Sequence, residues 1–566
     1  MHGGTEIRPI LASFASCLIY PWIHLNHSSI ESLHELKSKL IAVSGSQGEY
    51  IPVSQLSLLL DVDETQTSVL LDILSDVSDT GADVRRLCSS GESELVDVHR
   101  LLLLLLVHFH LNRARESSDD HWPRSSSHQN YHHQLEPSSP LKLHAKSFAS
   151  GSQSSQTMGV SDEHIQHETR RLADFLAAHV DDVLRLISDG DGSAPLSSQE
   201  LARLSFLLTG AVAELAGGSD VTGRVRDALA PGQGTVQQGN GTLEDNYGSD
   251  NITGIMTNNS NGCSDICDVL IHGVHKVTVI RGEEEIGPAE SVRIVDCHDS
   301  VIYILAPLKW AQVVSCTNSI VVLGAVGQSL RIEYSERLQV VAVTSHTVIN
   351  TCHDCIVYTA SNRPPLIVGD NRFVQLAPYN SGYDNLERHM ELAGISASVN
   401  RWDSAVTLMP ERPVFKHHPQ QNLHVQNQLD HSKSVTLLPP EKIMPFVIPF
   451  KGGQGPLCGG AAAPLTRGAS GDTLTGLLTQ EFVDFCPCPF PLPQVYVDAW
   501  KSRMAGIATV KEAYKTAKLS PEQKQAFTSS VQSFFKEWLH HGGGMREVYD
   551  LAKVEKGLAQ NNKQEQ

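Results

Sequence analysis

The segment CTNSIVVLGAVGQSLRIEYSERLQVVAVTSHTVINTCHDCIVYTA, residues 316–360, repeats one short pattern. Each copy begins with a polar turn and continues as a strand rich in valine and isoleucine, two residues that favour β structure. The pattern extends to both sides of the segment, and we assign the first strand residue of successive copies to Val301, Ile320, Leu338, Ile356 and Phe373. The resulting steps of 17 to 19 residues indicate an internal repeat.

A second apolar triplet recurs between these strands, at residues 312–314, 330–332, 347–349 and 366–368. Two or three short strands per copy, with no room for a helix, are typical of one coil of a parallel β-helix. The sequence therefore predicts an α+β protein, in which a central right-handed parallel β-helix is flanked by helical N- and C-terminal regions.

Cys352 and Cys355 have the spacing of a zinc knuckle or a redox pair. Both also fall on turn positions that small residues occupy in other copies. Cys352 is equivalent to Cys297, Cys316 and Ser335, and Cys355 is equivalent to Ser300 and Ser319. No second Cys/His pair lies at an obvious zinc-ligand spacing. We therefore favour a ladder of buried small side chains over zinc or redox chemistry, and expect no metal and no cofactor.

The composition limits the classes of partner. A formal charge of −19 argues against a nucleic-acid surface, because such a surface needs clustered Lys and Arg. The eleven cysteines are scattered through 566 residues, which is typical of a reduced, intracellular chain. The most apolar run, residues 101–111, is too short to cross a bilayer, so we expect a buried helix and no membrane insertion.

Changes in composition divide the chain into eight segments. We assign a helical region to 1–111, a disordered Ser/His-rich linker to 112–161, a helical hairpin to 162–216, a Gly/Asn-rich linker to 217–269, the β-helix to 270–410, a loop with strands to 411–450, a Gly/Pro-rich linker to 451–492 and C-terminal helices to 493–556. Apolar spacing predicts one helix over 54–74 in the first region.

The C-terminal sequence predicts a well-delimited helix. Ser520 is expected as the N-cap, Pro521 as the first residue, Gln523 as the partner in a capping box and Gly542 as the end. Its apolar face consists of Phe527, Val531, Phe534, Phe535, Trp538 and Leu539. We expect this face to pack on the preceding helix or on the β-helix, with a partner-binding face or a coiled coil as the alternative.

Residues 316–380, together with LERHMELAGI (386–395) and Trp402, resemble the β-helical domain shared by tubulin-folding cofactor C and the retinitis pigmentosa 2 protein. Two further segments, 434–450 and 493–541, resemble a branch of this family that is linked to positioning of the centrosome, spindle pole and Golgi. The resemblance implies a protein of the cytoplasm and cytoskeleton at the microtubule-organising centre, with cytoskeletal or centrosomal partners.

Activating members of this family stimulate GTPases with an arginine finger, a guanidinium that stabilises charge on the transferring phosphoryl group. By the same resemblance, registered on Cys352, the finger position is occupied by Val348 and the position of a family glutamate by Val368. Strand alternation directs Val348 outward, and also Arg331 one coil earlier, which we interpret as a solvated arginine. We therefore assign no catalytic residue.

Three residues, Arg331, His346 and Val348, are the candidates for contact with a partner. The function that the resemblance implies is a non-enzymatic scaffold that positions the centrosome, spindle pole, Golgi or equivalent structures. The alternative is a GTPase-activating protein for tubulin or an Arf-like GTPase that uses Arg331 as a displaced finger. A non-catalytic binder of tubulin folding intermediates is a third class.

Overall fold

The computed structural model describes residues 6–7, 29–44, 49–78, 85–87, 94–119, 162–189, 196–209, 223, 225–226, 255–257, 268–287, 290–408, 435–448 and 489–541. The central parts of the three predicted linkers, 120–161, 227–254 and 449–488, lie outside these residues. At the edge of the first linker, helix α6 continues to Asp119, further than the sequence predicts.

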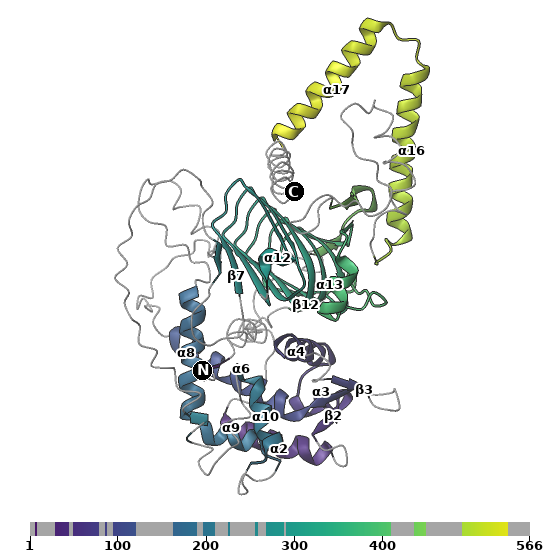
Figure 1. Ribbon diagram of the computed structural model, residues 1–566. Coiled ribbons are helices and arrows are strands. Elements are labelled where there is room, and N and C mark those ends of the chain that lie inside the picture. Colours follow the sequence, from purple (N-terminus) through teal and green to yellow (C-terminus); the bar gives the residue numbers. More distant parts are fainter. Residues whose placement is uncertain are drawn as a thin grey trace, which may run out of the picture.

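A parallel β-solenoid forms the centre of the molecule (Figure 1). Its strands are β7 (Asp268–His272), β8 (Thr278–Gly282), β9 (Ser291–Val295), β10 (Val301–Leu305), β11 (Leu308–Val314), β12 (Ile320–Glu333), β13 (Gln339–Asn350), β14 (Ile356–Ser361), β15 (Leu366–Val368), β16 (Val374–Pro378), β18 (Val406–Leu408) and β19 (Val435–Leu437). Each strand pairs in parallel with a strand one coil later, so the predicted α+β fold with a central parallel β-helix is confirmed.

Strand pairing corrects two of the assigned repeat positions. Ile320 pairs with Gln339 instead of Leu338, and Gln375 takes the place expected for Phe373. Leu338 is fully buried at the turn before its strand, and Phe373 has a φ of 57°, so both belong to turns. The apolar pattern misplaced them because a large apolar residue at the end of a turn, whether buried as Leu338 is or exposed as Phe373 is, resembles the first residue of a strand.

Cys352 and Cys355 lie inside the narrow turn of their coil, where both are fully buried. The Cys352 thiol donates to the carbonyl of Ile332 at 3.4 Å, and the Cys355 thiol donates to that of Ser335 at 3.5 Å. Burial raises the pKa of Cys352 well above that of a free thiol, which disfavours a thiolate ligand. These contacts support the ladder interpretation, and the described part of the chain holds no group of three His, Cys, Asp or Glu side chains placed to bind a metal.

Replacing both Cys352 and Cys355 with serine is expected to cost about 1 kcal/mol of unfolding free energy, because a hydroxyl can donate to the same carbonyls. Ser319 already does so, donating to the carbonyl of Thr317 at 2.8 Å. Urea denaturation measures the loss, and elemental analysis is expected to find no stoichiometric zinc. One zinc per chain that disappears in the double variant would contradict the ladder.

The N-terminal helices form a module on one side of the solenoid (Figure 1). They are α2 (Ile30–Ser44), α3 (Val53–Leu60), α4 (Glu64–Val77), α6 (Val98–Asp119), α8 (Asp162–Ala178), α9 (Val180–Ile187) and α10 (Ser198–Ala202), with an antiparallel sheet of β2 (Tyr50–Pro52), β4 (Glu94–Asp97) and β3 (Arg85–Leu87). The two predicted helical regions share one hydrophobic core, which contains the buried run Leu101–Val107 of α6. No described helix is long and apolar enough to span a membrane.

The helix predicted over 54–74 is two helices, α3 and α4. Asp61 ends α3 in the left-handed region with a φ of 57°, and Asp63 begins α4 by accepting from the backbone N–H of Gln66 at 2.6 Å. The Asp-x-x-Gln signal stands in the sequence, but the continuous apolar spacing concealed it. The break allows α4 to lie directly against the solenoid (Figure 1).

Two long helices, α16 (Gln494–Thr516) and α17 (Pro521–His541), form an arm at the other end of the molecule (Figure 1). The predicted capping box is present: the Ser520 hydroxyl accepts from the N–H of Gln523 at 3.3 Å, and the Gln523 side chain accepts from the N–H of Ser520 at 2.9 Å. The expected burial of the apolar face of α17 is wrong for all its members but Leu539, because the two helices diverge.

Candidate functional site

The site that the sequence singled out lies on the outer surface of the solenoid sheet formed by β11, β12, β13 and β15. Leu330 and Ile332 belong to the solenoid core, so Arg331 faces outward between them. Arg331 pairs with Val348 on the next coil, which also faces outward and pairs with Leu366. This is the orientation that strand alternation predicts.

This outward surface is nevertheless covered. Arg331 and Val348 have no exposed surface, and His346 is 1% exposed. Val348 and Val368 belong to the hydrophobic core of the N-terminal module. Ile349, the next residue after Val348 on the same strand, points the other way and belongs to the solenoid core. The interpretation of Arg331 as a solvated arginine is therefore wrong, because this side of the sheet is buried instead of facing water. Contact of these residues with a partner stays a prediction.

Arg331 is held in a polar cluster on the sheet itself. Its guanidinium donates to the carboxylate of Glu333, two residues along the same strand. The same carboxylate accepts from the amide of Gln312 at 2.9 Å and from that of Asn350 at 3.3 Å. All four side chains are buried, and the Glu333 carboxylate is the acceptor that joins the other three beneath the surface.

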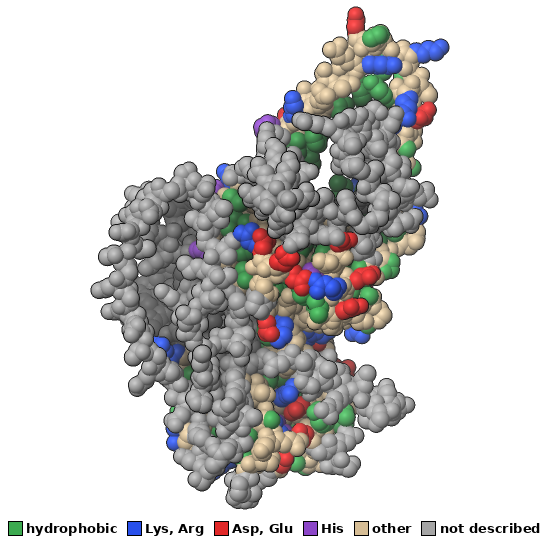
Figure 2. Space-filling view, viewed as in Figure 1, with side chains coloured by type: hydrophobic (Ala, Val, Ile, Leu, Met, Phe, Trp, Pro, Cys, Tyr) green, Lys and Arg blue, Asp and Glu red, His purple; other side chains and the backbone are tan. Residues whose placement is uncertain are grey.

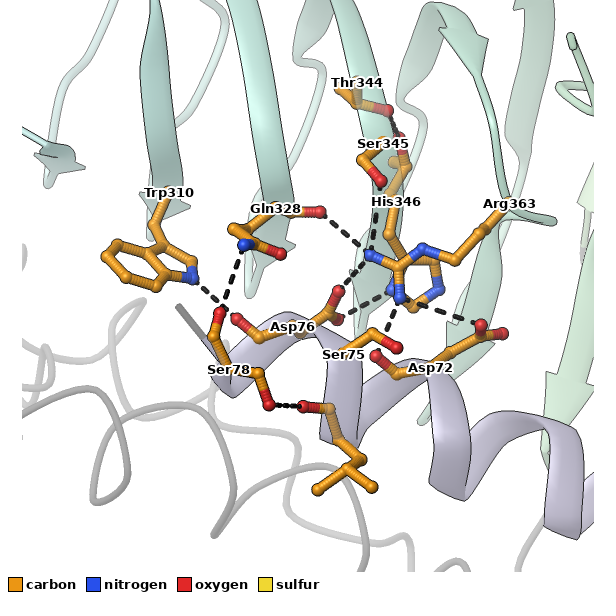
Figure 3. A network of polar contacts seen from close by, with 12 residues as sticks. Asp72, Ser75, Asp76, Ser78, Trp310, Gln328, Thr344, Ser345, His346 and Arg363 are labelled. Atoms are coloured by element: carbon orange, nitrogen blue, oxygen red, sulfur yellow. Dashed lines mark hydrogen bonds and ion pairs between the residues drawn. The ribbon is translucent and has the colours of Figure 1, made fainter. Parts of the chain in front are cut away.

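The C-terminal end of α4 makes the polar contact between module and solenoid (Figure 3). The Asp76 carboxylate accepts from Nδ1 of His346 at 2.7 Å and from the guanidinium of Arg363. Arg363 also donates to the carbonyl of Asp72 at 2.7 Å and to that of Gln328 at 3.1 Å. One arginine thus joins two turns of α4 to the middle of strand β12.

Two neutral hydrogen bonds flank this ion pair. Nε1 of Trp310 donates to the carbonyl of Asp76 at 2.8 Å, and Nε2 of Gln328 donates to the carbonyl of Ser78 at 3.1 Å. Both acceptors are carbonyls at the end of α4, where a helix leaves its last four carbonyls without internal partners. The solenoid therefore caps the end of α4 from two successive coils, through Trp310 of β11 and Gln328 of β12 (Figure 3).

The electrostatics of Asp76 follow from complete burial beside two basic groups. Burial would raise the pKa of Asp76, but the charge of Arg363, followed by the charge and hydrogen bond of His346, outweighs this effect and holds the pKa below its usual value. Asp76 is therefore an ionised carboxylate with no access to water. Such a group remains buried only while its partners stay in place.

Sequence reasoning missed Asp76 and Arg363, although it named His346. Asp76 ends the helical pattern IL-S-D and looks like a solvated last-turn residue, and Arg363 lies in the loop after β14. Asp76 and Arg363 bind each other but lie 287 residues apart in the chain, so no local sequence pattern indicates the contact. A carboxylate at the C-terminal end of a helix, where the dipole disfavours it, is the one local signal that it needs a cationic partner.

A second polar cluster lies where α13 (Leu386–Ala393) packs on β12. The Tyr383 hydroxyl lies 2.8 Å from Nδ1 of His389, whose Nε2 lies 3.2 Å from the carboxylate of Glu283. The order resembles a catalytic triad, but burial raises the pKa of Tyr383 far above its usual value, so its hydroxyl is no nucleophile. This cluster fixes α13 to the solenoid.

Residues 289–407, which include the whole covered face, match the family model described as tubulin binding cofactor C. The matched coils, residues 289–407, form a cofactor C domain. The match and the parallel coils agree with the resemblance drawn from the repeats, and the cofactor C domain carries both the Arg331 cluster and the residues that hold α4.

Several curated relatives named TBCC domain-containing protein 1 are similar to this chain. The human protein is 27% identical over 292 residues, which cover 52% of this chain and 44% of the relative. The Mus musculus protein is 28% identical over 283 residues (50% and 43%), and that of Danio rerio is 26% identical over 283 residues (50% and 41%). The chain therefore spans less than half the length of the relatives it matches.

Proposed function

We propose that this protein is a non-enzymatic cytoskeletal scaffold that acts at the microtubule-organising centre, where it positions the centrosome, spindle pole, Golgi or equivalent structures. The cofactor C domain supports a cytoskeletal role, since the family is described by tubulin binding. Partners of this scaffold are tubulin or other cytoskeletal and centrosomal proteins in the cytoplasm.

The proposal that the protein is not an enzyme rests on the burial of Arg331 and on its contact with Glu333. An arginine finger must reach a bound phosphate, and its guanidinium must be free to approach the transferring group. Arg331 is fully buried and bonded to Glu333, and its neighbour Val348 is apolar and belongs to the core of the N-terminal module. A displaced finger at Arg331 would require both the loss of the Glu333 contact and the removal of the module.

The decisive test is single-turnover GTP hydrolysis by tubulin and by an Arf-like GTPase, with and without the full chain. We expect no stimulation, whereas an arginine finger contributes on the order of 10³ to 10⁵ in rate. Co-sedimentation with tubulin, run on the same samples, distinguishes a scaffold that binds without chemistry from a chain that does not bind. Stimulation by the wild-type chain of more than about tenfold would decide for the activating alternative.

A further inference from the structure

Helix α17 carries an apolar stripe that the described part of the chain leaves exposed. Phe534 is 73% exposed and Trp538 is 60% exposed. Half-exposed apolar side chains continue the stripe at Phe527, Val531 and Phe535. A contiguous group of bulky apolar side chains in water is uncommon on a soluble protein and marks a surface that binds something.

The stripe has the geometry of one helical face. Positions 527, 531, 534, 535 and 538 fall within an arc of roughly 100° when successive residues turn by about 100° each. The opposite face is polar and weakly charged, with Gln525, Ser529, Gln532 and Ser533. Helix α17 is therefore amphipathic along its length, with three aromatic rings near its C-terminal end.

The attachment of the arm leaves this face accessible. The first turns of α16 are fixed to the solenoid, where the Tyr496 hydroxyl donates to the carbonyl of Leu438 at 2.7 Å and the Tyr496 ring packs edge-on against Trp402. Helices α16 and α17 meet at their joined ends, where the rings of Tyr514 and Phe527 stack at 4.9 Å, and then diverge (Figure 1). This junction is the end of the arm farthest from the solenoid, α17 runs back from it, and the stripe on α17 stays exposed (Figure 1).

The arm also differs from the rest of the chain in charge. Residues 494–541 contain seven Lys and Arg but four Asp and Glu, a formal charge of +3, whereas the whole chain carries −19. Figure 2 shows Lys and Arg side chains at the far end of the arm beside apolar ones. Lys515 and Lys518 lie next to the junction, and Lys524 lies in the first turns of α17. An anionic surface would attract the arm and repel the acidic body.

We propose that the arm formed by α16 and α17 docks on an anionic lipid surface, with the α17 stripe lying in the interface. Phe and Trp suit the boundary between headgroups and acyl chains, and the lysines around the junction of the two helices gain energy from anionic lipids. This is attachment in the plane of the surface, because the polar face of α17 is incompatible with crossing the bilayer.

A second copy of the chain is the competing occupant, and the side chains argue against it. The 4-3 spacing of Phe527, Val531, Phe534 and Trp538 matches a coiled-coil seam, but such seams prefer Leu, Ile and Val. The flanking positions carry Thr528, Ser530, Phe535 and Glu537, with one charge where several pairs of Glu and Lys would select a partner helix. Aromatic rings with a single charge at the flanks suit a lipid interface better than a helix partner.

The test is co-sedimentation of the full chain with vesicles of phosphatidylcholine alone and of phosphatidylcholine mixed with phosphatidylserine. We expect binding mainly to the mixed vesicles. Phe534→Ser combined with Trp538→Ser is expected to lower the affinity by about tenfold or more, and Lys515→Gln or Lys518→Gln by about fivefold each. Leu58→Ser is the matched control, since Leu58 is 86% exposed on α3 and its replacement is expected to change nothing.

Both aromatic residues are exposed, so circular dichroism is expected to show an unchanged fold in their double variant. Equal binding to both kinds of vesicle would overturn the role of charge, and no binding to mixed vesicles would overturn the proposal as a whole. Sedimentation equilibrium tests the competitor: a dimer that dissociates in the Phe534/Trp538 double variant, without vesicle binding, would assign the stripe to a second copy.

Discussion

Asp76→Ala is expected to lower the free energy of unfolding by about 3 to 5 kcal/mol, because removing one member of a buried ion pair leaves its partners buried without a counter-charge. Arg363 would lose its carboxylate, and His346 would lose the acceptor at 2.7 Å. The helix would keep its carbonyl contact with Trp310, which involves the backbone. Urea denaturation followed by circular dichroism measures the change.

The matched control for Asp76→Ala is Glu64→Ala on the same helix. Glu64 is an exposed carboxylate in the first turn of α4, so its loss is expected to cost no more than about 1 kcal/mol. Limited proteolysis adds a local readout, since Asp76→Ala is expected to speed cleavage in the N-terminal module before the solenoid is cut. Equal stability of the two variants would mean that the ion pair contributes nothing to the contact.

The solenoid was predictable from the sequence because its signal is repeated. A turn of small and polar residues followed by valine and isoleucine recurs at Ser300, Ser319 and Cys355, and each copy corrects errors in the others. Outward orientation at Arg331 followed from the two-residue period of a strand. The burial of Arg331 could not be predicted in the same way, because the two-residue period indicates which side of the sheet a residue faces and not what covers that side.

The covering module was beyond sequence reasoning for a related reason. The apolar outward residues Val348 and Val368 were interpreted through family positions, although an apolar row on the outer face of a sheet predicts a packing partner. The partner is a module whose core is built from two segments of the chain with a predicted linker between them. Long-range packing of this kind leaves no local pattern.

For helix α17 the prediction was wrong in the opposite direction, because burial was expected and the side chains are exposed. The apolar face of α17 predicted burial, because an amphipathic helix in a globular protein packs its apolar face inward. We expected this face to pack on the preceding helix or on the β-helix, yet Phe534 and Phe535 stay exposed. Periodicity identifies the face that must find a partner, and it does not say whether that partner is the same chain.

Val348→Arg is expected to destabilise the protein by at least about 3 kcal/mol instead of restoring an arginine finger, because the new guanidinium would be buried without a counter-charge. Val348 lies beside Arg331 in the strand register and beside Leu366 on the other side. The carboxylate of Glu333, on the neighbouring strand, already accepts from Arg331. Two guanidinium groups on adjacent strands would therefore repel each other beneath the module.

The control for Val348→Arg is Gln339→Arg on the same strand, because Gln339 is exposed and its replacement is expected to change stability by less than about 0.5 kcal/mol. Denaturation midpoints measure both variants, and proteolysis of the N-terminal module reports whether the covered face has opened. GTP hydrolysis by tubulin, assayed with the folded fraction of Val348→Arg, is expected to remain at its basal rate. A stable Val348→Arg variant that stimulates hydrolysis would show that the module leaves this face readily. The outer surface of the cofactor C domain would then be a docking site that the chain covers only transiently, and the scaffold proposal would have to give way to a regulated activator.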